Sequence, residues 1–174
     1  LLGNETRRFN FKNKVAPTGF IGSGLLASPF LFFGHNLDKL FSGNSSLSTE
    51  ILNFRLLFYS LSSVAYLFGT LFLTFEILKK LKYKFSYYEV ILFYFGSGVV
   101  YYAFERYSMT HVYEVFIATL IIYLSINFYT LENKNLHAFL IPLFIGIGLS
   151  VRWVNYFYFL LPLITKVLIS RKQD

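Results

Sequence analysis

Leu56-Leu-Phe-Tyr-Ser-Leu-Ser-Ser-Val-Ala-Tyr-Leu-Phe-Gly-Thr-Leu-Phe-Leu-Thr-Phe75 is a run of twenty residues that carries no charged side chain. A helix rises about 1.5 Å per residue, so a run of this length can cross a hydrocarbon core of about 30 Å. Arg55 precedes the run and Glu76 follows it, so charges bound it on both sides. The stretch therefore predicts a transmembrane helix over residues 56–75.

The composition supports a membrane protein. A soluble domain usually carries about a quarter charged residues, whereas 14% of this chain is charged and 55% is hydrophobic. Too few polar side chains remain to cover a soluble globule. The chain has no cysteine, which excludes cysteine-based catalysis, zinc–thiolate sites and disulfides within it. The net charge of +7 does not indicate a nucleic-acid partner, because the basic residues lie between apolar runs.

Four further apolar runs are bounded by charged or polar residues, and they cover residues 90–104, 115–131, 138–151 and 153–165. They are shorter than most spans, which have about 17 to 25 residues. They reach spanning length only if flanking aromatic and basic side chains lie at the membrane interfaces. We therefore expect an all-α, polytopic transmembrane bundle of about five helices within residues 56–174.

Residues 1–55 differ from the rest of the chain. Their apolar stretch, residues 20–34, is interrupted by glycines and by Pro29. A short stretch with a central proline favours an interfacial or re-entrant helix over a sixth transmembrane helix. We expect residues 1–55 to form an extracytoplasmic loop that carries this helix. The glycines here and later in the chain are expected to allow turns or close helix approach.

Basic residues determine the predicted orientation. Those that follow the first and last spans are Lys79, Lys80, Lys82, Lys84, Lys166, Arg171 and Lys172. The positive-inside tendency of short loops places both segments in the cytoplasm, so we expect a multi-pass protein with a cytoplasmic carboxy-terminal end. Glu76 is expected to pair with Lys79 or Lys80, one helical turn later.

With this topology, ionisable residues that are uncommon in membrane spans gather on the outer face. The candidate substrate-binding residues are Glu105, Arg106, His111, Glu114 and Arg152. His111 and Glu114 share a helix face if the helix begins at Ser108 or Thr110, and the N–H groups of such a start can face an anion. Arg152 lies in a tight turn between two apolar runs, where its planar guanidinium suits a lipid phosphate.

Structural explanations compete with these roles. Glu105 or Glu114 could pair with Arg106 or Arg152 and so hold helix ends together. Arg152 could also reach ordinary lipid headgroups. Both explanations stay open at this stage.

No cofactor is evident from the sequence. The spacing of His111 and Glu114 supplies two metal ligands, and neither His35 nor His137 has a motif that adds a third. The ligands of a divalent metal ion therefore cannot be identified in this chain.

Three stretches look like one known family. They are Ala16-Pro-Thr-Gly-Phe-Ile-Gly-Ser-Gly-Leu-Leu-Ala-Ser-Pro-Phe30, Tyr107-Ser-Met-Thr-His-Val112 and Gly146-Ile-Gly-Leu-Ser-Val-Arg-Trp-Val-Asn155. In this order, with Arg55 just before a long span, they resemble the polytopic GT-C glycosyltransferases. The nearest resemblance is to the group of dolichyl-phosphate-mannose protein mannosyltransferases and bacterial aminoarabinose transferases.

The resemblance implies an inverting transfer of a sugar from a polyprenyl-phosphate donor at the extracytoplasmic face. It implies that an acidic residue of the first outer loop is the base, and no residue here matches that position. Because the chain begins at Leu1 and not at Met, we expect an internal segment whose catalytic base lies upstream of Leu1. On this hypothesis Arg152 and Arg106 bind the phosphate. His111 and Glu114 then contact the acceptor or the donor.

Two other classes of protein stay open. A non-catalytic helical subunit of a large membrane complex, with other membrane subunits as partners, would account for short spans and structural charge pairs. A transporter core would need helices broken near mid-membrane. The glycine-containing runs within residues 138–165 are compatible with such breaks, so this class also stays open. A glycosyltransferase would instead have membrane lipid and a polyprenyl-phosphate sugar donor as partners.

Overall fold

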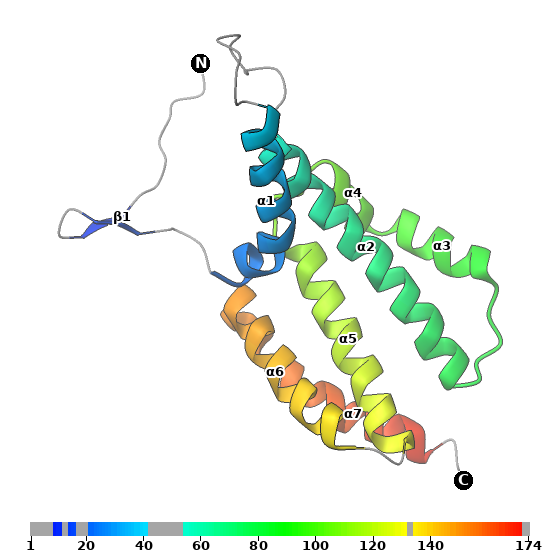
Figure 1. Ribbon diagram of the computed structural model, residues 1–174. Coiled ribbons are helices and arrows are strands. Elements are labelled where there is room, and N and C mark those ends of the chain that lie inside the picture. The colour runs from blue at the N-terminus through cyan, green and yellow to red at the C-terminus, as the bar shows by residue number, and fades with distance from the viewer. Residues whose placement is uncertain (1–8, 12–13, 17–20, 42–53, 132–133, 172–174) are drawn as a thin grey trace.

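The computed structural model describes residues 9–11, 14–16, 21–41, 54–131 and 134–171, which form a helical bundle and one small hairpin (Figure 1). The hairpin pairs strand β1 (Phe9–Phe11) with strand β2 (Lys14–Ala16) in antiparallel register. Every other described element is a helix, so the predicted helical fold class is confirmed.

Three helical segments among the described residues are long and apolar enough to cross a membrane. They are α2 (Phe54–Lys80), α5 (His111–Thr130) and the segment Trp153–Ser170, which joins the 3-10 helix η1 (Trp153–Leu160) to α7 (Leu161–Ser170). Helix α6 (Asn135–Val151) is apolar but shorter. The membrane character of the chain is thus supported, whereas the predicted number of five spans is not confirmed.

The 3-10 geometry of η1 lengthens the last of these segments. A 3-10 helix rises about 2.0 Å per residue, against about 1.5 Å in an α-helix. The eight residues of η1 and the ten of α7 therefore cover about 31 Å, where an α-helix of equal length would cover about 27 Å. This length matches a hydrocarbon core of about 30 Å.

The helix predicted over residues 90–104 is corrected to two short helices, α3 (Tyr87–Gly96) and α4 (Gly98–Phe104). They are separated at Ser97, whose hydroxyl donates to the carbonyl of Tyr94 and accepts from the N–H of Val99. A serine that bonds nearby backbone groups competes with the helix ladder and caps the helix that follows. The break therefore has a local cause in the side chain of Ser97.

Helix α1 (Ile21–Phe41) is longer than the predicted stretch 20–34 and continues through Pro29. Proline has no N–H to bond the carbonyl four residues earlier, which here belongs to Leu25. The Ser28 hydroxyl donates to this carbonyl at 2.7 Å and replaces the missing bond. This compensation explains why the proline does not end the helix.

Helix α1 packs antiparallel along the first half of α2 (Figure 1). Gly34 of α1 lies against the backbone of Phe54, whereas the carbonyl of Leu26 accepts a hydrogen bond from the hydroxyl of Tyr66. Helix α1 is not among the three segments long and apolar enough to span a membrane. Its predicted interfacial or re-entrant position, and the division of the chain after residue 55, stay predictions.

Asp38 of α1 caps the start of α2. Its carboxylate accepts hydrogen bonds from the N–H groups of Phe54 at 2.9 Å and Arg55 at 3.4 Å, and from Arg55 Nε at 2.8 Å. The first N–H groups of a helix have no acceptor within it, and a negative charge there is favoured by the helix dipole. The Arg55 guanidinium, with these backbone bonds, holds the pKa of Asp38 below its usual value, so the carboxylate is ionised at neutral pH.

Loss of this carboxylate is expected to fray the start of α2. In Asp38→Ala the N–H groups of Phe54 and Arg55 lose their acceptor, so their hydrogens should exchange faster with solvent. Exchange at buried Leu67, in the middle of the same helix, should stay as in the wild type. Hydrogen exchange in detergent measures both, and Asp38→Asn, which keeps one amide oxygen as acceptor, should fall between. Equal exchange in wild type and Asp38→Ala would contradict the cap.

The other end of α2 closes in a left-handed turn at Lys82, whose φ is 51°. The N–H of Tyr83 donates to the carbonyl of Leu78 at 3.0 Å, and that of Lys82 donates to the carbonyl of Lys79 at 2.9 Å. These are the two hydrogen bonds of a Schellman motif. Glycine is the usual residue at the left-handed position, because a Cβ is disfavoured there.

Lys82→Gly is therefore expected to stabilise the protein by up to about 1.5 kcal/mol. The substitution removes a left-handed penalty of about 1–2 kcal/mol and adds an unfolded-chain entropy cost of about 0.5–1 kcal/mol. Unfolding in mixed detergent micelles measures the difference. Lys82→Ala keeps the Cβ and is the matched control. The assignment fails if Lys82→Gly is no more stable than Lys82→Ala.

Helix α5 is the centre of the bundle and packs against α2, α6 and α7 (Figure 1). Tyr113, Ile117 and Ile121 are spaced by four residues and are fully buried, so they line one face of this helix. The Tyr113 hydroxyl is 2.8 Å from that of Ser62 on α2. This packing fixes the first turn of α5, where two of the predicted site residues lie.

Candidate functional site

The five predicted site residues lie at two junctions of the helical bundle. Glu105 and Arg106 follow α4, and His111 and Glu114 belong to the first turn of α5. Arg152 separates α6 from η1. Helix α5 begins directly after Thr110, which agrees with one of the two starts that the sequence predicted. We call the end of the bundle that holds both junctions the junction end.

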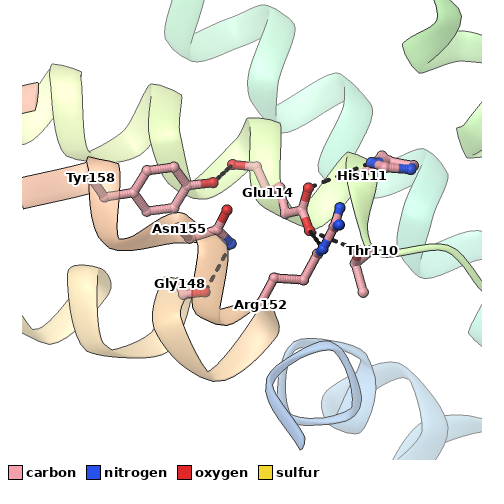
Figure 2. Close-up of polar contacts among 7 residues, drawn as sticks. All are labelled: Thr110, His111, Glu114, Gly148, Arg152, Asn155 and Tyr158. Atoms are coloured by element: carbon pink, nitrogen blue, oxygen red, sulfur yellow. Dashed lines mark hydrogen bonds and ion pairs between the residues drawn. The ribbon is translucent and has the colours of Figure 1, made fainter. Parts of the chain in front are cut away.

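Glu114 is the centre of a polar cluster at the junction end (Figure 2). Its Oε1 accepts a hydrogen bond from Thr110 Oγ1 at 2.7 Å and lies 3.5 Å from Arg152 Nε. Its Oε2 lies 3.5 Å from His111 Nδ1. A carboxylate removed from water costs free energy unless it is paired, and these neighbours pair it. We call Thr110, His111, Glu114 and Arg152 the Glu114 cluster.

The members of the Glu114 cluster differ in exposure. The Glu114 side chain is 14% exposed, whereas those of His111 and Arg152 are 37% and 42% exposed. The contact between Arg152 and Glu114 is made by Nε, the inner nitrogen of the guanidinium. The cluster is therefore a mostly buried carboxylate flanked by a cation and an imidazole that a ligand can reach.

Of the charge pairs that the sequence left open, the structure contains the pair between Glu114 and Arg152. This ion pair joins the first turn of α5 to the turn after α6. It therefore holds helix ends together, as the structural explanation of these charges expects. The i, i+3 proximity of His111 and Glu114 is confirmed. At the far end of α2, Lys79 Nζ lies 2.8 Å from Glu76 Oε1, which confirms the predicted local pair there.

Two side chains of η1 hold the turn at Arg152 in place (Figure 2). Asn155 Nδ2 donates to the carbonyl of Gly148 at 2.9 Å, and the Tyr158 hydroxyl donates to the backbone carbonyl of Glu114 at 2.8 Å. These bonds tie η1 to both α6 and α5. Tyr158 was not singled out from the sequence, because the same run also contains Asn155 and a second tyrosine, Tyr156, and nothing in the sequence distinguishes the two tyrosines.

Glu105 and Arg106 lie at the same junction but outside the Glu114 cluster. Both are exposed, and Arg106 Nε donates to the hydroxyl of Tyr101 at 3.3 Å. Within the part of the chain that the structure describes, neither forms an ion pair with the cluster or with each other. Their role in substrate binding stays a prediction.

Aromatic side chains border the Glu114 cluster. The rings of Tyr102 and His111 lie 4.4 Å apart. Trp153, directly after Arg152, stacks on Tyr156 with an interplanar angle of 19° and is 64% exposed. Exposed Trp and Tyr side chains are typical of a membrane interface, which is where the predicted topology puts this turn.

The described residues contain no group of three or more His, Asp and Glu side chains that could hold a metal ion. His111 and Glu114 provide two such ligands. We assign no cofactor to the cluster.

Comparison with known proteins assigns no family to the chain. No family model, no curated protein and no solved structure matches it. The resemblance to GT-C glycosyltransferases therefore stays a prediction from the three quoted stretches.

Proposed function

We propose that the chain is part of a multi-pass membrane glycosyltransferase that takes a sugar from a polyprenyl-phosphate donor at the extracytoplasmic face. The observation that supports this best is the Glu114 cluster, in which two junctions far apart in sequence contribute a carboxylate, an imidazole and a guanidinium. Ionisable groups beside membrane spans are costly and commonly mark a substrate path. The resemblance in the quoted stretches supports the same class of enzyme.

In this proposal Arg152 binds the phosphate of the lipid donor. Its Nε faces Glu114, which orients the planar group, while its outer donors serve two phosphate oxygens. Departure of the lipid phosphate develops negative charge, which a fixed cation in a water-poor site stabilises. Arg106 and Glu105 border the site, and His111 and Glu114 contact hydroxyl groups of donor or acceptor. The proposal assigns no catalytic base and no cofactor to these residues.

We further propose five membrane passes with the carboxy-terminal end in the cytoplasm. Helices α2 and α5 run in the same direction. Ser62 of α2 contacts Tyr113 of α5, and further along both helices Lys80 of α2 contacts Tyr123 of α5. The chain between them, α3 and α4, must then return to the junction end. Helix α6 makes the same return between α5 and η1. Helix α6 has 17 residues, and residues 87–104 number 18. Both lengths are enough to cross a bilayer that is thinned locally or covered in part by neighbouring helices.

The direct test is transfer of the sugar. The full-length protein is reconstituted in liposomes with a panel of labelled polyprenyl-phosphate monosaccharides and a panel of hydroxyl-bearing acceptors. Formation of the labelled glycoside is followed together with release of polyprenyl phosphate. Trp153 is the single tryptophan of the chain, so its fluorescence reports binding next to Arg152. We expect a saturable change with the phosphorylated lipid and none with the free polyprenol. The proposal fails if no phosphorylated lipid changes the fluorescence and none is turned over.

A second candidate function is that of a non-catalytic subunit of a membrane complex. In the segment Trp153–Ser170 only 6% of the residues are buried, against 44% of the residues in the most apolar 18-residue stretch of α5. The segment therefore exposes large apolar side chains to whatever surrounds the bundle. Further helices packed on this face would favour a subunit. Purification in a mild detergent distinguishes the two: a fixed set of co-purifying membrane proteins without sugar transfer would favour the subunit.

A further inference from the structure

Exposed basic residues gather at the end of the bundle opposite the Glu114 cluster, where α2, α5 and α7 end and α6 begins (Figure 1). We call this the basic end. Its exposed basic residues are Lys79, Lys80, Lys82, Lys84, Lys134, Lys166 and Arg171. They come from three separate segments of the chain, so the fold and not one local run brings this charge together.

Acidic side chains at the basic end are already engaged. Glu76 pairs with Lys79, and the Glu89 carboxylate accepts a hydrogen bond from the N–H of Ser86 at 3.1 Å. Within the described ranges, Lys82 and Lys84 have no acidic partner. The turn between α2 and α3 therefore carries two lysines that form no ion pair with any described residue.

The same turn is surrounded by exposed aromatic and apolar side chains. Tyr83 and Tyr87 are each 53% exposed and Tyr88 is 79% exposed, and the next turn of α3 exposes Leu92 and Phe93. At a membrane interface, an apolar surface lies in the hydrocarbon, tyrosines lie at its border and lysines lie among the headgroups. The α2–α3 turn has this order of side chains. A nucleic acid or an acidic soluble protein would match the lysines but not the adjoining apolar surface.

Lys82 adds an independent observation. It occupies the left-handed position of the turn, where glycine would be more stable. A residue kept in an unfavourable backbone conformation suggests a function for its side chain. Here the side chain contributes a positive charge at the centre of the α2–α3 turn.

We propose that the basic end is a binding surface for the headgroups of anionic phospholipids, with Lys80, Lys82 and Lys84 as its main contacts. A lysine near an anionic membrane surface is attracted to it, and the attraction falls as salt screens it. The surface prefers phosphatidylglycerol-type or phosphatidylserine-type lipids over phosphatidylcholine. This inference does not depend on the proposed sugar transfer.

The test places a fluorescent reporter beside the turn. Tyr88→Trp in a Trp153→Phe background puts the single tryptophan of the chain next to the lysines, and brominated lipids quench it when they bind nearby. We expect brominated phosphatidylglycerol to quench more strongly than brominated phosphatidylcholine, and the preference to weaken at high salt. Replacing the three lysines by glutamine should lower the preference by at least about fivefold, the effect of one fully effective lysine. Replacing them by arginine should preserve it.

Two controls keep the outcome decisive. Lys39→Gln removes an exposed lysine from α1, outside the basic end, and should leave the preference unchanged. Lys82→Gly is expected to be more stable than the wild type, so a reduced preference in this variant cannot come from unfolding. Equal quenching by the two lipids, or an undiminished preference in the triple glutamine variant, overturns the proposal. Tighter binding of the protein to soluble RNA than to phosphatidylglycerol liposomes would also overturn it.

Discussion

Arg152→Ala should lower the rate of the proposed sugar transfer by about 10²- to 10³-fold, because in that proposal it removes a fixed positive donor at the point where the lipid phosphate leaves. Arg171→Ala, at the opposite end of the same helical segment, should leave the rate close to that of the wild type. Arg152→Lys keeps a charge but loses the planar fork, so its rate should fall between the two. Initial rates over a range of donor concentrations measure the effect.

The stability of Arg152→Ala has to be separated from its activity. The substitution leaves the mostly buried Glu114 carboxylate without its cation, which alone destabilises the fold. The double variant Glu114→Gln, Arg152→Met removes both charges, and Thr110 can still donate to the new amide oxygen. We expect this variant to regain most of the stability and none of the transfer. If it regained transfer, the role of Arg152 would be to hold two helix ends together.

The sequence predicted those parts of the structure that depend on local periodicity and on charge. Residues 56–75 were predicted to be helical because twenty residues without a charge leave the backbone no better way to satisfy its hydrogen bonds in a bilayer. The contact between His111 and Glu114 was expected because residues three apart in a helix are neighbours. The tight turn at Arg152 followed from one charge between two apolar runs.

The contacts that complete the site depend on tertiary packing. The sequence placed Arg152 and Glu114 on the same face but could not choose among several possible charge pairs. The choice is made by η1, which Asn155 and Tyr158 fasten to backbone carbonyls of α6 and α5. Bonds to backbone carbonyls leave no pattern in the sequence, because every residue offers the same acceptor. The break at Ser97 differs, because its cause is local: the apolar run predicted one helix, and the glycines beside Ser97 were expected to allow either a turn or close helix approach.

The glycines show the same limit. A pair of small residues predicts close approach but does not say which of the two faces a neighbour. A Cβ at Gly22 would overlap the backbone of Val151, whereas one at Gly24 would meet nothing within 4 Å. Gly148 and Gly146 differ in the same way: a Cβ at Gly148 would meet the ring of Tyr158, whereas one at Gly146 would meet nothing within 4 Å.

Gly148→Ala should therefore destabilise the protein by about 1–3 kcal/mol, whereas Gly146→Ala should be neutral or stabilising by up to about 1 kcal/mol. A Cβ on Gly148 would lie 2.6 Å from Cδ2 of Tyr158 and 3.4 Å from Cγ2 of Ile117. The Tyr158 ring cannot move away freely, because its hydroxyl is bonded to the carbonyl of Glu114. Both glycines lie in α6, so helix propensity affects them equally and the difference isolates the contact with Tyr158.

A double-mutant cycle tests that cause. In a Tyr158→Ala background the ring is absent, so adding Gly148→Ala should cost much less free energy of unfolding than it does in the wild type. Unfolding in mixed detergent micelles measures all four proteins. If Gly148→Ala and Gly146→Ala have equal effects, or if the cost of Gly148→Ala persists without the ring, the packing of η1 on α6 is wrong. If the cycle gives the expected coupling between the two substitutions, Gly148→Ala should also slow the proposed sugar transfer, because the displaced Tyr158 moves the turn that carries Arg152.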